Sequence, residues 1–191
     1  MDNTAKNKTY TYADYMNYPE NERIELIEGK IYAMSPAPSR IHQELISELI
    51  TIFNNYIKSN NGNCKVYPSP FDVFLTDDKS LDNCKNIVQP DISIICDKTK
   101  LNDKGCIGAP DMIIEIVSPH NPSNDYVRKL GLYEHFKVKE YWIINPMNKS
   151  ILIYRLNDTM HYAAPETYNF TDTIKVGIYD SLEIDFNTLD V

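Results

Sequence analysis

The stretch QPDISIICDKTKLNDKGCIGAPDMIIEIVSP, residues 89–119, contains the features that decide the fold. It holds two apolar runs, and each follows a Pro-Asp dipeptide, with Asp91 in the first copy and Asp111 in the second. Short runs rich in isoleucine and valine predict strands. The second run also carries Glu115 between isoleucines and a valine, which indicates a strand buried on both faces. A carboxylate buried there without a partner would cost several kcal/mol, so the sequence predicts a partner for Glu115.

The spacing of the two aspartates indicates which one works with Glu115. Asp111 and Glu115 share a strand face but lie about 13 Å apart on an extended strand, too far to share one Mg²⁺. We therefore interpret Asp111 as a strand-entry residue. Asp91 precedes Glu115 by 24 residues, and the intervening segment is long enough to return the chain. We expect the two runs to lie side by side, with Asp91 and Glu115 on the same face and converging on a cation.

Residues alone leave the partner of Glu115 open. A metal ion, a lysine or a bound proton would each remove the cost of burying the charge. A buried salt bridge that only stabilises the fold would meet the same requirement.

Composition narrows the class of protein. A chain of 191 residues fits one domain with a sizeable core. The formal charge of −8 argues against a protein that coats nucleic acid through a broad basic surface, but a nuclease with a metal site stays possible. The four cysteines lack zinc-site spacing, and no apolar run reaches membrane-spanning length. We expect a cytoplasmic protein with reduced thiols.

Apolar periodicity predicts the remaining elements. We expect one domain over 1–191, with an N-terminal helical extension (1–22), a core (23–146) and C-terminal strands (147–191). In the core, a hairpin over 23–34 precedes a long helix over 39–61 capped by Ser39. Further strands are expected at 65–67, 72–75, 87–96 and 111–117. The order strand 111–117, helix 124–137, strand 140–145 predicts a βαβ unit with parallel strands, and 150–156 should pair with the last strand.

Four motifs, in this order, carry a family resemblance: ELIEGKIYAMSPAPSRIHQ, VQPDISIICD, GAPDMIIEIVSP and DYVRKLGLYEHFKVKEYWIINP. Together they resemble the Uma-two family of restriction-endonuclease-like proteins, which lies in the PD-(D/E)XK nuclease superfamily. The resemblance runs from about Glu25 to Pro146. It implies an α/β (α+β) fold with a restriction-endonuclease-like core, a mixed β-sheet flanked by helices. It also implies a Mg²⁺-dependent DNA endonuclease, in which Mn²⁺ can substitute.

The resemblance also implies roles for individual residues. Asp91 and Glu115 match the two acidic positions of the family, and with the backbone carbonyl of Ile116 they would hold Mg²⁺. The superfamily has a lysine two residues after the glutamate, where this chain has Val117. Lys129, in the following helix, fits a displaced lysine that would orient the attacking water and stabilise charge on phosphorus. A surface ion pair between Asp125 and Lys129 is the competing interpretation of their spacing.

Four more residues are possible accessory members of the site. Glu28 and His42 coincide with family positions, although a hairpin-turn glutamate and a helix-start histidine commonly have no further role. Asp125 and Tyr133 share a helix stripe with Lys129, because the three are spaced by four residues.

DNA is the expected partner, and a homodimer is expected because cleavage of both strands by one-site enzymes usually needs two subunits. Two other function classes stay open. The first is a catalytically degenerate nuclease fold that acts as a DNA-binding or protein-interaction module. The negative net charge of the chain and Val117 at the usual lysine position favour it. The second is a plain interaction domain in which Glu115 is structural.

Overall fold

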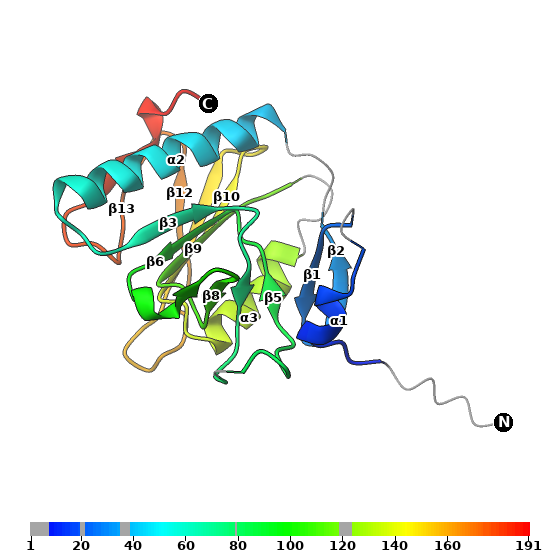
Figure 1. Cartoon of the computed structure of the whole chain (residues 1–191). Coiled ribbons are helices and arrows are strands. Elements are labelled where there is room, and N and C mark those ends of the chain that lie inside the picture. The colour runs from blue at the N-terminus through cyan, green and yellow to red at the C-terminus, as the bar shows by residue number, and fades with distance from the viewer. Residues whose placement is uncertain (1–7, 20–21, 35–38, 79, 119–123) are drawn as a thin grey trace.

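The structure is a computed structural model that describes residues 8–19, 22–34, 39–78, 80–118 and 124–191, without the side chains of 124 and 125. Its central element is a six-stranded mixed sheet in the order β12-β11-β10-β9-β6-β3 (Figure 1). The strands are β3 (Lys65–Pro68), β6 (Ile92–Ile95), β9 (Met112–Ile116), β10 (Glu140–Asn145), β11 (Ser150–Arg155) and β12 (Glu166–Asn169). This mixed sheet confirms the predicted fold class.

The parallel pair within this sheet is β9 and β10, which confirms the predicted βαβ unit. The helical segment between them is η2 (Asn124–Lys129), a π-helix, followed by α3 (Leu130–His135). β6 runs antiparallel to β9, in a register that pairs Ile92 with Ile114. The two apolar runs of the deciding stretch are therefore neighbours, as predicted.

A second six-stranded sheet has the order β2-β1-β5-β4-β8-β7. Its strands are β1 (Ile24–Ile27), β2 (Lys30–Ala33), β4 (Val73–Phe74), β5 (Ile87–Val88), β7 (Leu101–Asn102) and β8 (Gly105–Ile107). β1 and β2 form the predicted hairpin, and Glu28 and Gly29 both have positive φ in its turn, as a two-residue primed turn requires. The short helix α1 (Tyr12–Met16) packs through its tyrosines against this sheet.

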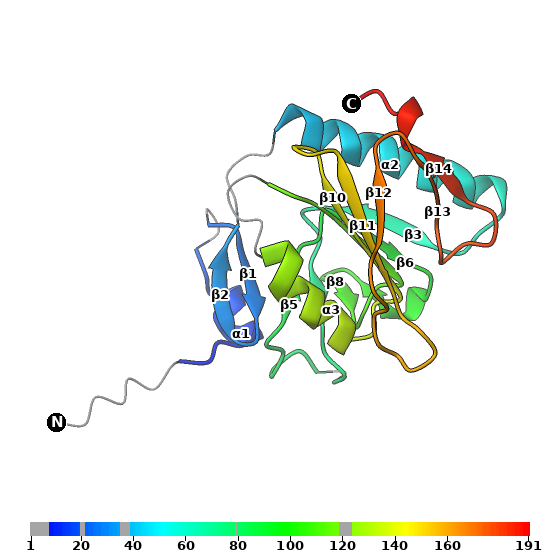
Figure 2. The ribbon, with the colours of Figure 1, turned by 180° about the vertical axis from the view of Figure 1, so that it is seen from behind.

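Two layers cover the faces of the central sheet (Figure 2). α2 (Arg40–Ser59) and the hairpin of β13 (Thr173–Lys175) and β14 (Glu183–Asp185) pack on one face. The helical segment η2–α3 and the second sheet pack on the other. β9 divides its side chains by strict alternation: Ile114 and Ile116 lie in the core under α2, and Ile113 lies in the core with α3. Glu115 and Val117 continue the α3 face.

The long helix follows from its sequence. Leu45, Leu49 and Phe53 are fully buried at four-residue spacing, and they form the apolar stripe that packs on the sheet. The Ser39 hydroxyl accepts a hydrogen bond from the amide of His42, which confirms the predicted cap. Two short 3-10 helices, η1 (Lys98–Lys100) and η3 (Phe186–Thr188), complete the elements described. None of the helices described is both long and apolar enough to cross a membrane.

Two local predictions are wrong. Residues 87–96 form two strands, β5 and β6, which belong to different sheets. Pro90 lacks an amide hydrogen and breaks the run, so the chain changes sheets between Gln89 and Asp91. Apolar periodicity over 124–137 also predicts an inward-facing Val127, but its side chain is 68% exposed. Val127 lies two residues before Lys129, on the opposite side of the helical segment from the buried pair Lys129 and Tyr133, which are four residues apart.

The cysteine prediction also needs correction. Cys64 and Cys96 form a disulfide, whereas Cys84 and Cys106 are free and buried. The register of β3 and β6 explains the pairing, because Lys65 lies opposite Ile95 and the next pair outward is Cys64 and Cys96. The expectation of reduced thiols is therefore wrong for this pair.

The disulfide closes a ring with a sequence separation of 32 residues. We predict that Cys64→Ser lowers the free energy of unfolding by roughly 3–4 kcal/mol relative to the oxidised wild type, because the cross-link restricts the unfolded chain. Urea denaturation with and without a reductant measures this difference. The reduced wild type should match Cys64→Ser, and equal stability of the oxidised and reduced wild type would contradict the prediction.

Candidate functional site

The carboxylate of Glu115 lies beneath the helical segment that follows its strand. The ammonium of Lys129 is 2.8 Å from Glu115 Oε1, and the Tyr133 hydroxyl donates a hydrogen bond of 2.8 Å to the same oxygen. Lys129 is the last residue of η2, and Tyr133 lies one turn later in α3. The structure therefore brings together three residues that the sequence assigned to one site.

A second carboxylate shares the same lysine. Glu25 Oε1 lies 2.9 Å from Lys129 Nζ, and the side chains of Glu25, Glu115 and Lys129 are each no more than 5% exposed. Glu25 belongs to β1 of the second sheet, so the lysine joins residues of both sheets. With both acids ionised, this buried cluster carries a net charge of −1, which is costly in a low-dielectric interior.

Sequence reasoning missed Glu25, although a signal was present. The residue lies in RIELI, an apolar run that becomes a fully buried strand, just as Glu115 lies in MIIEIV. A carboxylate in a buried strand needs a partner in either case. Applied to both runs, that argument would have selected Glu25 along with Glu115.

Asp91 lies one position before β6 begins. Continuing the register from the pair Ile92 and Ile114 brings Asp91 opposite Glu115. Asp91 Oδ2 accepts a 2.7 Å hydrogen bond from the amide of Ile116, the residue that follows Glu115. The amide of Ser69 donates to the backbone carbonyl of Asp91 at 3.1 Å. These bonds fix Asp91 at the end of the sheet beside Glu115.

The side chains of Asp91 and Glu115 are held from different layers, so the structure does not confirm that the two carboxylates converge on one face of the sheet. Asp91 Oδ2 lies 3.2 Å from His42 Nε2 at the start of α2, whereas Lys129 and Tyr133 come from the layer on the opposite face. The start of α2 and the end of β9 both lie on the side of the molecule that carries β1 and β2 (Figure 1). Within the residues described, no group of three or more histidine, cysteine, aspartate or glutamate side chains forms a ready metal cage.

His42 is a buried member of this region. Its side chain is 10% exposed, and its second ring nitrogen, Nδ1, is buried without a hydrogen-bond partner among the described residues. A buried histidine with one ring nitrogen on Asp91 differs from the surface helix-start residue that its position commonly indicates. The contact therefore brings His42 to the predicted site residue Asp91.

Gln89, just before the first Pro-Asp, connects the site to the second sheet. Its amide donates a 2.9 Å hydrogen bond to Glu25 Oε1. Its side-chain amide donates to Asp72 Oδ1 at 2.8 Å and to the Tyr15 hydroxyl at 3.2 Å, and its side-chain oxygen accepts from Arg23. Burial and the neighbouring Asp72 carboxylate raise the pKa of Tyr15 above its ordinary value, so its hydroxyl stays a donor. This network anchors Glu25 beside Lys129.

The other predicted site residues lie elsewhere or are not described in full. Glu28 lies in the β1–β2 turn with an exposed side chain, and its amide donates to the Asn86 side chain. The side chain of Asp125 is outside the described part of the structure, although its backbone lies in η2. Ile116 contacts Asp91 through its amide, so the role of its carbonyl stays a prediction. The role of Asp91 as a metal ligand also stays a prediction.

Asp111, in the second Pro-Asp copy, lies just before β9 begins, at the end of the strand away from Glu115. Its Oδ2 accepts a 2.7 Å hydrogen bond from the amide of Cys96, and its Oδ1 lies 2.6 Å from the ammonium of Lys139. These contacts are those of a strand-entry residue, in agreement with the interpretation of the sequence.

Arg128 lies beside the buried lysine but points the other way. Its side chain is exposed, and its guanidinium carbon lies 4.6 Å from the centre of the Tyr32 ring. Tyr32 is in β2, in the same hairpin as Glu25. The rim of the site therefore has a positive charge held over an aromatic ring, a contact that stabilises an arginine side chain.

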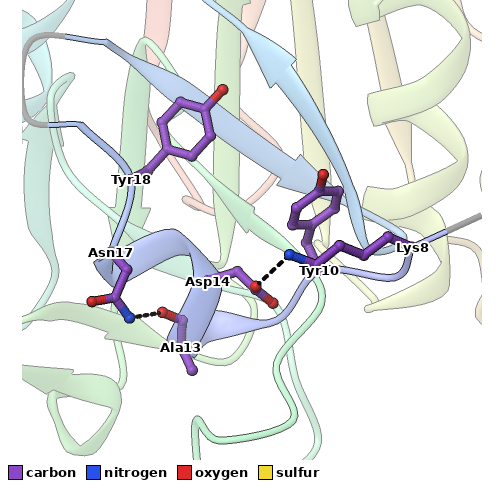
Figure 3. A pocket seen from close by; sticks show the side chains of 6 residues that line it. All are labelled: Lys8, Tyr10, Ala13, Asp14, Asn17 and Tyr18. Carbon is purple, nitrogen blue, oxygen red and sulfur yellow. Dashed lines mark hydrogen bonds and ion pairs between the residues drawn. The ribbon is translucent and has the colours of Figure 1, made fainter.

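A hollow of about 400 Å³ lies apart from these residues, beside α1 (Figure 3). An ion pair of 3.1 Å between Lys8 and Asp14 crosses it. The residues that line it are Lys8, Tyr10, Ala13, Asp14, Asn17 and Tyr18. None of the predicted site residues is among them, so the hollow is separate from the candidate site.

Comparison with known proteins finds a matching family and similar individual proteins. The model of the Uma2 family, described as "putative restriction endonuclease", matches residues 12–187. An uncharacterized protein of Synechocystis sp. is 27% identical over 148 residues, which cover 76% of this chain and 73% of that protein. A crystal structure from Anabaena variabilis, described as a putative nuclease belonging to DUF820, has a TM-score of 0.74 at 21% identity and covers 94% of this chain and 96% of its own.

The charge cluster generates a stability prediction. Lys129→Met leaves Glu25 and Glu115 buried without their shared cation, and we expect it to lower the free energy of unfolding by about 3–5 kcal/mol. The triple variant Lys129→Met, Glu25→Gln, Glu115→Gln removes all three charges and should regain most of that loss. Lys139→Met, which breaks an ion pair whose lysine is 67% exposed, is the matched control and should cost less than about 1 kcal/mol. Equal losses for the two lysine variants in urea denaturation would contradict the prediction.

Proposed function

The chain belongs to the Uma2 family, and on that premise we propose that it is a metal-dependent endonuclease that hydrolyses phosphodiester bonds of DNA. The family indicates a nuclease, and the finer statements, the Mg²⁺ ion and the DNA substrate, are part of the proposal. The observation that carries it is the buried charge around Lys129, where the described side chains supply two carboxylates and one ammonium. A site of this kind is stabilised by a further cation.

The charge of the region matches a divalent ion. Glu25, Glu115 and Asp91 contribute three negative charges when ionised, and Lys129 contributes one positive charge. With His42 neutral, the net charge is −2, which one divalent cation neutralises. Carboxylate oxygens are the donors that Mg²⁺ prefers, and this ion commonly uses one or two carboxylates and keeps several waters. The residues present therefore fit an open Mg²⁺ site, although the part of the chain that is described contains no three-residue cage.

Asp91, Glu115 and the backbone carbonyl of Ile116 would hold the ion, and Mn²⁺ would substitute for Mg²⁺. When bound, the ion supplies a polarised phosphate oxygen and a water of lowered pKa. The bond from the Ile116 amide to Asp91 keeps the two carboxylates at neighbouring strand positions.

Side chains near the ion would stabilise charge and orient the reacting groups. The Lys129 ammonium is fixed 2.8 Å from Glu115, where it would stabilise negative charge that builds on phosphorus and orient the attacking water. Tyr133 orients Glu115 through its hydroxyl. His42 would orient Asp91 from the start of α2. Lys129, in the helical segment, would thus take the role of the lysine that the superfamily has two residues after the glutamate, where this chain has Val117.

DNA as the substrate is supported by the basic rim. Arg128 lies in η2 next to Lys129. Its exposed guanidinium, which lies over the Tyr32 ring, could bind a phosphate of the DNA backbone.

We also propose that the whole chain acts as one domain, that it works as a homodimer and that it is cytoplasmic. Size-exclusion chromatography with light scattering would test the dimer.

A second candidate function is a catalytically degenerate nuclease fold that binds DNA or another protein. Val117 at the usual lysine position and the formal charge of −8 favour it. The two functions differ in metal binding, because a degenerate module has no need of an ion held by Asp91. Calorimetric titration with Mn²⁺ would separate them: uptake that depends on Asp91 favours the enzyme.

Asp91→Asn and Glu115→Gln test the catalytic proposal. Each keeps the shape of its side chain but removes a charge that would hold the ion, so we expect Mg²⁺-dependent cleavage of plasmid DNA to fall by about 10²-fold or more. Asp111→Asn is the matched control, since it alters the other Pro-Asp copy, and it should leave cleavage unchanged. Circular dichroism should show that all three variants are folded. Cleavage at the wild-type rate by both purified site variants would reject the assignment.

Arg128→Ala tests the substrate contact. If the guanidinium neutralises one phosphate, the variant should bind DNA more weakly for every sequence, and the slope of log K against log salt should become less negative by about 1. Fluorescence anisotropy with a labelled duplex at several salt concentrations gives both values. Lys58→Ala, in the last turn of α2, is the charge-matched control. An Arg128→Ala slope identical to the wild type would exclude the contact.

A further inference from the structure

We propose that Glu25 is a positioning residue of this site: it holds the Lys129 ammonium in place when a divalent cation takes over the carboxylate of Glu115. The proposal rests on the proposed function, because it concerns the metal-bound state of the same site. It assigns to Glu25 a role that acts through Lys129, without direct contact with the ion or the substrate.

The first observation is the division of one ammonium between two carboxylates. Lys129 Nζ lies 2.8 Å from Glu115 Oε1 and 2.9 Å from Glu25 Oε1, so the two acids hold it about equally. Only one of them, Glu115, is opposite Asp91 in the strand register. Glu25 comes from β1 in the other sheet. Lys129 is therefore fixed between Glu115, a proposed ion ligand, and Glu25, which belongs to the other sheet.

The second observation is that Glu25 is itself fixed. Its Oε1 accepts a 2.9 Å hydrogen bond from the amide of Gln89, two residues before Asp91. The same oxygen thus has two donors, one from the backbone and one from Lys129. Glu115 Oε1 likewise has two donors, Lys129 and Tyr133, and of the two acids only Glu115 lies opposite Asp91 in the strand register. This favours a positioning role for Glu25 over a role as an ion ligand.

The physical need for a second acid follows from the charges. A divalent cation on Glu115 competes with the ammonium for that carboxylate and repels it, because both are positive. Without Glu25, Glu115 is the one acid of this described pair left to Lys129, and the ion would compete for it. With Glu25 present, the ammonium keeps a carboxylate at its existing position.

The test compares Glu25→Gln with the wild type, using the full chain labelled with ¹⁵N-lysine. A buried, ion-paired ammonium gives a resolved NMR signal, which the absence of a signal in Lys129→Met assigns to Lys129. We expect the wild type to keep this signal both without metal and in saturating Mg²⁺. Glu25→Gln should keep it without metal, where Glu115 still accepts the ammonium, and lose it in Mg²⁺.

Kinetics should give a matching result. In Glu25→Gln we expect kcat for DNA cleavage to fall by about 10–10²-fold, the scale of loss caused by a misplaced catalytic group. KM for DNA and the Mg²⁺ affinity from calorimetry should stay within about threefold of the wild type, as expected when an interaction of the transition state alone is lost. Glu183→Gln, an exposed acid in β14, is the charge-matched control and should behave as the wild type.

Three results would overturn the proposal. A Lys129 signal that persists in Glu25→Gln with Mg²⁺, together with normal kcat, would make Glu25 purely structural. A Mg²⁺ affinity that falls more than about tenfold would make Glu25 an ion ligand. A wild-type protein that takes up no divalent ion in calorimetry would reject the proposed function itself, and with it the role of Glu25. That last failure is visible before any variant is made.

Discussion

The arrangement of the molecule depends on one buried ammonium. Lys129 is 4% exposed and lies between carboxylates that belong to two different sheets. Taking three charges out of water is costly, and the cost is recovered only where the geometry is close and the remaining oxygens have donors. Tyr133 supplies a donor to Glu115, and the Gln89 amide supplies one to Glu25. The same contacts that make the cluster tolerable fix the second sheet against the end of the first.

The spacing of residues in the helical segment explains how a lysine from a helix reaches a strand carboxylate. Val117 lies on the same face as Glu115 but is packed in the apolar core with α3, so this strand has no cation of its own. Lys129, at the end of η2, lies four residues before Tyr133 in α3, so both side chains lie on one face of the segment and contact Glu115. The helical segment therefore supplies the cation that this strand lacks.

The sequence predicted what depends on local pattern and failed where long-range geometry decides. The β1–β2 hairpin, the Ser39-capped α2 and the βαβ unit of β9 and β10 follow from periodicity and turn residues. The transfer of 87–96 between two sheets and the disulfide depend on which strands become neighbours, and residue spacing does not contain that information. At the site, Glu115, Lys129 and Tyr133 were assigned to one site and their side chains are in contact. Glu25 was missed because the burial argument was applied to one apolar run only.

The two Pro-Asp copies show how a structural ion pair differs from the proposed site. Asp111 has one lysine, Lys139, whose charged end is largely exposed, and its other oxygen caps the amide of Cys96. That pair is balanced and adds little beyond anchoring the strand. At the opposite end of β9, the side chains described comprise three acids and one buried lysine, and among them the Nδ1 atom of His42 is buried without a hydrogen-bond partner. A pair that only stabilised the fold would have no reason to retain the excess negative charge, since neutral side chains of similar volume would stabilise it better. The excess is what a cation-binding site requires.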